Sequence, residues 1–458
     1  MNTTKQIKPV LGLYGVLEKS EEGWEDAAST LREVQRELEA LGVEVHAVRE
    51  IVSDDASADK AARTLEAADP DLLLAVILTW SFDHLSVRIL KHLDRPLGIL
   101  AVPGIHSGSL VGAHQLSCLL TDLGVERSVF YGDVHIPETY KPLLSYARAA
   151  AVRRRLQRGK IGFVGRRTPG MTPIAFDEVE VMRTFGCQVL SYGWEEIDSL
   201  VERIEDRRVE EELLRLQHLG GSVTSGEDAL RRSVGLYLAL KDLAQTEGIV
   251  AYSLGCYPHL AGIVCLGIGM LCEDGLPAAC EGDMNAGLAM YLVQALTGEP
   301  AHFGEILDID EEANTIVTSH CGCAAPSLAA DPAKIALVPV RIWERGVCIR
   351  FPAKAATEVT YLNLVGRKGS YRLCAASGSA VASDMVFDGN PVKFKPHCSW
   401  RCFLQVIDEH GFGHHWMMGY RNVTEELRHF CRLTGIKGVF VRGGDPPSGI
   451  QEIPQTKA

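Results

Sequence analysis

Two acidic residues and a histidine fall within 40 positions of one another, and a pair of histidines follows much later in the chain. Glu281 lies in a Cys-Glu-Gly-Asp segment, Glu305 follows Phe-Gly, and His320 precedes Cys-Gly-Cys. His414 and His415 follow a glycine-rich turn. Carboxylate oxygens combined with imidazole nitrogens suit a divalent ion such as Mn²⁺. Such an ion can hold two neighbouring oxygens of a sugar while carboxylates move protons between its carbons.

The two acidic candidates differ in their predicted surroundings. Glu281 follows an apolar run over 276–280 and precedes a helical pattern, so we expect it at the carboxyl end of a strand, where α/β sheets present ligand groups. Asp283 better fits the alternative role of a carboxylate at the helix N-terminus. We expect Glu305 in an acidic loop that also holds Asp308 and Asp310. Any of these three could be the second carboxylate; we favour Glu305, with Asp308 next.

The histidines follow strand-like segments. His320 ends the alternating segment 314–319, and a satisfied core histidine is the alternative interpretation. His414 and His415 are adjacent on what we predict to be an extended segment, where neighbouring side chains point to opposite sides. We therefore expect only one of the pair to reach a given ion, and we favour His415.

The elements that must position these residues change in type along the chain. Short apolar runs alternate with helical patterns up to about residue 155, and a second such series begins at residue 160. This alternation indicates βαβ units and parallel sheets. Strand-like stretches then prevail at 338–342, 347–351, 358–365, 370–375 and 403–407, and one helix is predicted at 424–433. We predict an α/β protein with two parallel-sheet α/β domains (1–155 and 156–300) plus a C-terminal, mainly antiparallel β domain (301–458).

Composition excludes several partner classes. The formal charge of −13 disfavours nucleic acid and anionic membrane surfaces. No apolar run reaches the roughly 18 residues of a membrane span, and the N-terminus lacks the pattern of a secretory signal. We therefore expect a cytoplasmic protein that binds neither membrane nor nucleic acid.

The 13 cysteines form no compact framework along the chain. In a cytoplasmic protein we expect them to be reduced and buried as small apolar residues. Cys321 and Cys323 lie next to His320, but their spacing differs from the C-x₂-C of zinc fingers, and no second pair follows at the required distance. The spacing therefore disfavours a structural zinc site.

Several segments in a fixed order resemble the L-fucose isomerase and L-arabinose isomerase superfamily. They are Thr-Trp-Ser-Phe at 79–82, Gly-Ser-Leu-Val-Gly at 108–112, Gly-Arg-Arg-Thr-Pro-Gly-Met at 165–171, and the Cys-Glu-Gly-Asp, Ser-His-Cys-Gly and Gly-His-His segments. The match covers most of the chain. It implies three domains, Mn²⁺-dependent aldose–ketose isomerisation, and a homo-oligomer, often a hexamer, with active sites between subunits.

The resemblance also implies residue roles. Glu281 matches the first carboxylate, which binds the metal and transfers protons, and Glu305 matches the second. His320 matches a ligand of the arabinose-type members, and His415 matches the C-terminal histidine ligand. The candidate substrate-binding residues are Trp80, Arg166, Met171 and His414. Ligand type alone does not separate Mn²⁺ from Co²⁺ or Mg²⁺.

The expected reaction interconverts a free aldose and its ketose through a cis-enediol. One carboxylate removes the proton at C2 and returns one at C1, while the other moves a proton between the oxygens. An anionic hexose is one candidate substrate, and sulfoquinovose is plausible because shortened members of the superfamily include isomerases for it. Cations that could bind such a substrate are Arg166, Arg167, Lys393, Lys395, His397 and Arg401. The alternatives are a metal-dependent sugar epimerase and a non-catalytic sugar-binding protein.

Overall fold

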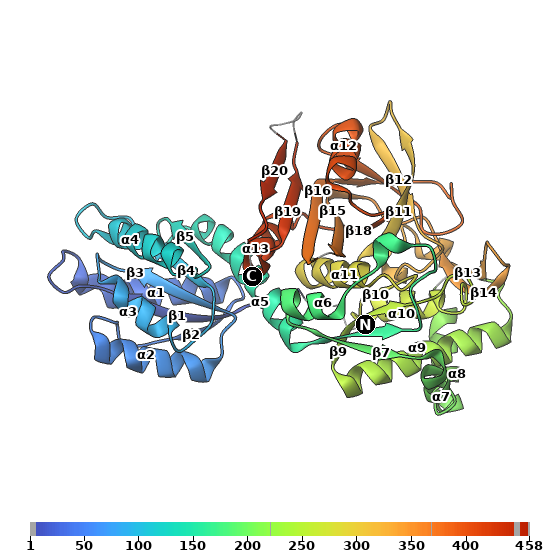
Figure 1. Ribbon diagram of the computed structural model, residues 1–458, viewed down its shortest axis with the longest axis horizontal. Helices are drawn as coiled ribbons and strands as arrows, with labels where there is room; N and C mark the ends of the chain where they lie inside the picture. Colours follow the sequence, from blue (N-terminus) through green and yellow to red (C-terminus); the bar gives the residue numbers. More distant parts are fainter. Residues whose placement is uncertain (1–5, 220, 368, 444–448, 457–458) are drawn as a thin grey trace. The chain divides into compact units, whose positions relative to one another are not determined.

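The computed structural model describes residues 6–219, 221–367, 369–443 and 449–456. The chain divides into two compact units (Figure 1). One holds Ile7–Arg154, and the other holds Gln6 and the described residues from Arg155 onward. The boundary falls inside one helix, α5 (Lys141–Arg158).

The first unit is built on a five-stranded parallel sheet with the strand order β2-β1-β3-β4-β5. Its central strand β3 is buried at every position, which explains the uninterrupted apolar run in the sequence. The strands are β1 (Val10–Val16), β2 (Glu44–Ala47), β3 (Leu72–Ile77), β4 (Leu97–Ala101) and β5 (Arg127–Tyr131). The helices before α5 are α1 (Ala27–Ala40), α2 (Asp55–Ala68), α3 (Asp83–Leu90) and α4 (Ser109–Asp122).

The second unit begins with a parallel sheet of order β10-β9-β6-β7. Its strands are β6 (Lys160–Val164), β7 (Gln188–Tyr192), β9 (Ile249–Leu254) and β10 (Ala278–Ala279). Its helices are α6 (Glu178–Phe185), α7 (Trp194–Val201), α8 (Asp206–Gln217), α9 (Glu227–Glu247), α10 (Cys265–Glu273) and α11 (Met284–Thr297). Helix α11 is buried almost throughout, because it packs against β9 on one side and against the antiparallel strands β15 and β18 (Figure 1).

The antiparallel part of this unit closes on itself. Six strands form a ring in the order β15-β18-β11-β12-β17-β16, since β16 pairs back to β15. Strands β19 and β20 extend the sheet beyond β16, and β19 is the parallel exception. The bounds are β11 (His302–Asp310), β12 (Thr315–Ser319), β15 (Ala356–Arg367), β16 (Ser370–Val381), β17 (Val392–Pro396), β18 (His415–Gly419), β19 (Lys437–Val441) and β20 (Ile450–Ile453).

The remaining elements are short or peripheral. Strands β8 (Ser222–Val223), β13 (Ala336–Val340) and β14 (Arg345–Arg350) form a small separate sheet. Two helices, α12 (Trp400–His410) and α13 (Thr424–Thr434), lie on either side of β18 in the chain. The 3₁₀ turns are η1 (Trp24–Asp26), η2 (Pro137–Tyr140), η3 (Thr172–Ile174), η4 (Pro326–Leu328) and η5 (Pro332–Lys334). Among the helices that the structure describes, none is both long and apolar enough for a membrane span.

The predicted fold class is confirmed, and two local predictions are wrong. The segment 403–407, predicted as a strand, belongs to helix α12, where Cys402, Phe403 and Val406 form a buried helical stripe and Ser399 caps the first turn. Glu305 lies within strand β11 and not in a loop, because β11 pairs with β12 on one side and β18 on the other. The domain division at residue 300 stays a prediction.

Candidate metal centre

A strained turn carries Glu281. Glu281 and Gly282 follow strand β10 and both have positive φ, at 63° and 73°. The backbone N–H of Thr168 donates to Glu281 O at 3.0 Å, and Gly282 N–H donates to Leu254 O at 3.0 Å. A Cβ at Gly282 would lie 2.8 Å from the Cα of Arg167. The turn is therefore held from two sides, which fixes where the Glu281 side chain starts.

Strand register supplies the other three residues. Strand β11 lies between β12 and β18, and Glu305 pairs with His415 on β18 and with Ser319 on β12. Directly paired residues of antiparallel strands share one face of the sheet. His320 comes next after Ser319, so the register brings Glu305, His320 and His415 to one end of the ring of strands. The buried Phe303 ring lies 4.6 Å from the His320 ring and 4.8 Å from the His415 ring, between centroids.

The ligand atoms of these residues converge. Glu281, His320 and His415 each offer one atom within 4.8 Å of the others. The Glu281 Oε2–His415 Nε2 distance is 3.2 Å, and Glu305 Oε1 lies 3.9 Å from the same nitrogen. Within the described residues, the buried atoms Glu281 Oε2 and His415 Nε2 make no hydrogen bond. Buried polar atoms normally have a hydrogen-bond partner, and these two atoms have none. A divalent cation bound between them would supply the missing partner.

Asp283 orients the His415 ring. Its Oδ2 lies 2.8 Å from His415 Nδ1, while its Oδ1 accepts from Ala286 N–H at 3.0 Å and caps helix α11. The Nδ1–H of the imidazole is thus donated to a carboxylate, which leaves Nε2 free for a metal ion. Sequence reasoning assigned Asp283 only the capping role. The sequence shows that residue 283 is acidic, but it gives no sign of the contact between Asp283 and His415, which lies 132 positions later in the chain.

The electrostatics favour a bound cation. Burial alone would lower the pKa of His415, but the hydrogen bond to Asp283 and the nearby Glu281 carboxylate raise the pKa to about 9. Burial alone would raise the pKa of Glu281, but the nearby imidazoles of His415 and His320 lower it. Without a metal, a proton on His415 Nε2 therefore balances the carboxylates. A metal ion takes the place of that proton.

His414 also approaches this group, contrary to expectation. The His414 and His415 ring centroids are 4.0 Å apart, and His414 Nε2 lies 3.9 Å from Glu305 Oε1. The two side chains do not point to opposite sides, because strand β18 begins only at His415 and His414 lies in the bend before it. Asn363 holds this bend, since its Nδ2 donates to Gly413 O at 3.3 Å and to His415 O at 2.6 Å.

The remaining candidates lie in varied positions. Asp308 is exposed on β11 opposite Val317, and the metal-binding groups found among the described residues do not include it. Arg166 is exposed, and its loop packs on the Glu281 turn, where a Cβ at Gly282 would lie 2.9 Å from Arg166 O. Met171 is half-buried and precedes η3. Trp80 belongs to the first unit, where its Nε1–H donates to Gln115 at 3.0 Å.

Two of the predicted cations already face acidic partners. Lys393 Nζ lies 3.9 Å from Asp310, and Arg401 lies 2.9 Å from Glu311. Both acidic residues belong to the β11–β12 hairpin. These cations are therefore less suited to an anionic substrate than Arg166.

Comparison with known proteins identifies relatives, although no family model matches the chain. The sulfoquinovose isomerase of Clostridium sp. strain MSTE9 is 28% identical over 380 residues, covering 79% of this chain and 84% of the relative. That of Alkalicoccus urumqiensis is 24% identical over 429 residues, covering 91% and 96%. The L-arabinose isomerase of Geobacillus stearothermophilus is 22% identical over 338 residues, covering 70% and 67%. The chain is a relative of these isomerases. The resemblance to the L-fucose and L-arabinose isomerase superfamily is thereby confirmed.

The solved structures that match this chain do not support a further conclusion about its fold or function. The solute-binding protein of Agrobacterium vitis, bound with α-D-tagatopyranose, is 14% identical and covers 64% of this chain and 90% of its own, with a TM-score of 0.18. A TM-score this low carries no argument.

Proposed function

We propose that this isomerase relative interconverts a free aldose and its ketose with the help of a divalent ion, Mn²⁺ being the first candidate and Co²⁺ or Mg²⁺ the alternatives. One observation carries the proposal: Glu281 Oε2 and His415 Nε2 are buried 3.2 Å apart, make no hydrogen bond to any described residue, and lie within reach of a second carboxylate. The ligands are Glu281, Glu305, His320 and His415. When bound, the ion holds two neighbouring sugar oxygens and stabilises the negative charge of the enediolate.

The two carboxylates divide the proton transfers. The Glu281 side chain is 11% exposed, whereas the Glu305 side chain is 33% exposed. Glu305 is therefore the carboxylate more open to an entering sugar, and we assign it the proton that moves between C2 and C1. Glu281 then moves the proton between the oxygens. Asp283 keeps the His415 ring in place throughout, because its contact is on the far nitrogen.

The substrate class follows from the relatives and from the loop beside Glu281. The matches to sulfoquinovose isomerases are longer and more identical than the match to the G. stearothermophilus L-arabinose isomerase. We propose a sulfonated hexose such as sulfoquinovose. Arg166 is exposed on the loop that packs on the Glu281 turn, and a guanidinium suits a sulfonate. Met171 and His414 complete the proposed sugar-binding set, and Trp80 stays a prediction from the resemblance.

Assembly and location belong to the same proposal. We expect a homo-oligomer, hexameric by resemblance, in the cytoplasm. Sedimentation of the purified chain would measure the number of subunits, and a monomer that is fully active would contradict this expectation.

A panel of aldoses tests the function. Sulfoquinovose, glucose, fucose and arabinose are incubated with the metal-free protein, with Mn²⁺ and with excess EDTA, and ketose is measured. We expect ketose from the sulfonated sugar with Mn²⁺, and none with EDTA. A product epimeric at one carbon would favour the epimerase. Sugar binding that does not depend on Mn²⁺, with no ketose formed, would favour the binding protein.

A further inference from the structure

A second group of potential ligands lies around the Nδ1 atom of His320. Cysteines from separate segments gather there: Cys256 after β9, Cys265 at the start of α10, Cys280 after β10, and Cys321 and Cys323 after β12. All are free thiols, and all but the partly exposed Cys321 are buried. The function proposed above uses none of them.

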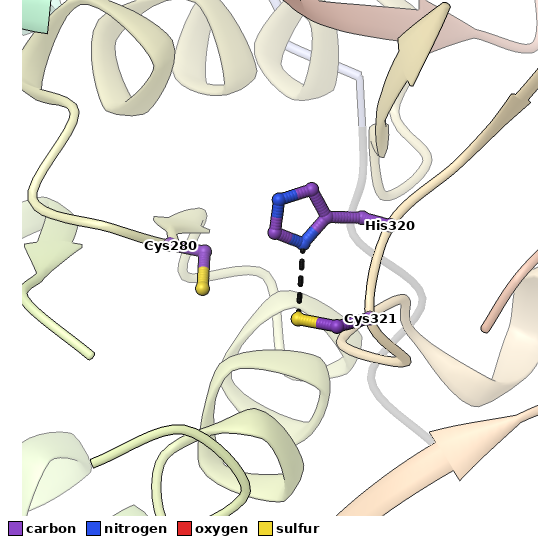
Figure 2. A group of neighbouring side chains, drawn as sticks. All are labelled: Cys280, His320 and Cys321. Carbon is purple, nitrogen blue, oxygen red and sulfur yellow. Dashed lines mark hydrogen bonds between the residues drawn. The ribbon is translucent and has the colours of Figure 1, made fainter. Parts of the chain in front are cut away.

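The thiols converge on one nitrogen of the His320 ring. Nδ1 lies 3.3 Å from Cys321 Sγ and 3.8 Å from Cys323 Sγ. Cys280, His320 and Cys321 each offer an atom within 4.8 Å of the others. Figure 2 shows these three side chains gathered between the segment that follows β10 and the segment that follows β12. Cys256 Sγ lies 3.0 Å from Cys280 Sγ at the edge of the group.

Simple packing explains this arrangement poorly. A buried free cysteine normally behaves as a small apolar residue among apolar neighbours. Cys374 in β16 and Cys431 in α13 fit that description, and neither belongs to a potential metal-binding group in the described part of the chain. The thiols around His320 instead face one another and a ring nitrogen.

The distances suit a tetrahedral ion. Zinc binds thiolate sulfur at about 2.3 Å and histidine nitrogen at about 2.0 Å, so tetrahedral angles place sulfur and nitrogen ligands about 3.5 Å apart. The observed 3.3 and 3.8 Å lie on either side of this value. Two sulfur ligands would be about 3.8 Å apart by the same geometry. At 3.0 Å, the sulfur atoms of Cys256 and Cys280 are too close for both to bind the ion. Cys280 belongs to the potential metal-binding group, so we take Cys280 as the ligand and Cys256 as a residue packed beside it.

We propose that Cys280, Cys321 and His320 Nδ1 bind a thiophilic ion, Zn²⁺, beside the carboxylate centre, with Cys323, whose Sγ lies 3.8 Å from the same nitrogen, as the candidate fourth ligand. The sulfur ligands select Zn²⁺, whereas the carboxylates of the first centre select a harder ion such as Mn²⁺. His320 then offers Nδ1 to the sulfur-rich site, and its ring can bind a second ion through Nε2 only as an imidazolate that has lost both N–H protons. The sequence disfavoured zinc because the spacing is not C-x₂-C and no second cysteine pair follows; the third thiol, Cys280, instead comes from a segment earlier in the chain.

Cobalt is a direct probe of the proposed site. Co²⁺ is added to the metal-free, reduced full-length protein, and the absorption spectrum is recorded. Thiolate ligands produce a sulfur-to-cobalt charge-transfer band, which carboxylate and imidazole ligands do not. We expect the band in the wild type and in Glu281→Gln, and its loss on adding Zn²⁺. No band in the wild type would overturn the proposal.

Matched variants identify the ligands. We expect Cys321→Ser combined with Cys323→Ser to abolish the band, and Cys431→Ser and Cys118→Ser to retain it. Retention in the double variant would overturn the proposal. Because serine variants can fail to fold, the wild type is also alkylated with and without Zn²⁺ and the labelled cysteines are read by mass spectrometry. Zn²⁺ should protect Cys321 and not the exposed Cys118, and equal labelling of Cys321 in both samples would contradict the site.

Discussion

Asp283 Oδ2 lies 2.8 Å from His415 Nδ1, although 132 positions separate the two residues in the chain. The same carboxylate caps helix α11 through its other oxygen. One side chain therefore ties the start of a helix in the parallel-sheet region to the first residue of a strand in the antiparallel ring. The carboxylate also sets which imidazole nitrogen is free.

Replacing Asp283 by Asn should weaken metal binding more than it weakens the fold. Asn caps helices as well as Asp does, but its amide does not hold the Nδ1–H of His415 with a charge. We expect Mn²⁺ affinity to fall by about 10–100-fold, with activity partly restored by excess Mn²⁺. Free Mn²⁺ measured by electron paramagnetic resonance gives the affinity. Asp177→Asn, at the cap of α6, is the matched control and should leave the affinity unchanged.

One pair of variants tests which carboxylate on strand β11, Glu305 or Asp308, takes part in catalysis. Glu305 lies 3.9 Å from His415 Nε2, whereas Asp308 is exposed opposite Val317. Glu305→Gln should lower kcat by about 10²–10⁴-fold, as expected for the loss of a general acid/base. Asp308→Asn should leave kcat almost unchanged. A larger loss in Asp308→Asn would show that the second carboxylate is wrongly assigned.

Gly282→Ala tests the turn that presents Glu281. The new Cβ would meet Arg167 Cα at 2.8 Å, and φ is already 73°. We expect the free energy of unfolding to fall by more than about 1 kcal/mol, together with weaker Mn²⁺ binding. Gly170→Ala is the control that has the backbone strain without the steric clash, because Gly170 has φ 86° and no atom lies within 4 Å of the position of an added Cβ. If both variants lose the same stability and both bind Mn²⁺ as the wild type does, the close packing at Gly282 does not contribute to metal binding.

The buried His302 should make stability depend on pH. Burial lowers the pKa of His302 to about 4, and its Nε2 lies 2.7 Å from Asn390 O. In the unfolded chain the pKa is about 6.5, so as the pH falls below that value the unfolded state gains a proton that the folded state does not. This contribution to stability is complete above pH ~6.5 and is lost progressively toward pH ~4, with a maximum of about 3 kcal/mol.

Denaturant unfolding at pH 7 and pH 5 measures this effect. His302→Gln should be less sensitive to the pH change than the wild type. His114→Gln, at an exposed position of α4, should behave as the wild type does. An unchanged pH slope in His302→Gln would rule out His302 as the source.

Local pattern was sufficient for much of the fold. The apolar run of β3, the amphipathic stripe of α13 and the alternation of strands and helices before residue 300 each depend on neighbours a few positions away. For the same reason Glu281 could be placed at a strand end. The pattern predicted a strand at 403–407, and this prediction is wrong. The apolar residues there suit either a strand or a helix, and Ser399 caps the helix α12 that the structure has.

By itself, the sequence determined the chemical types available: carboxylates, imidazoles and thiols at the ends of elements, in an order shared with a superfamily. Only the tertiary structure decided which of them meet. The pairing of Glu305 with His415, the contact of Asp283 with His415 and the gathering of thiols at His320 Nδ1 all depend on strand register and on packing between distant segments. Such contacts leave no local periodicity in the chain, because their energy comes from groups that meet only when the whole unit has folded.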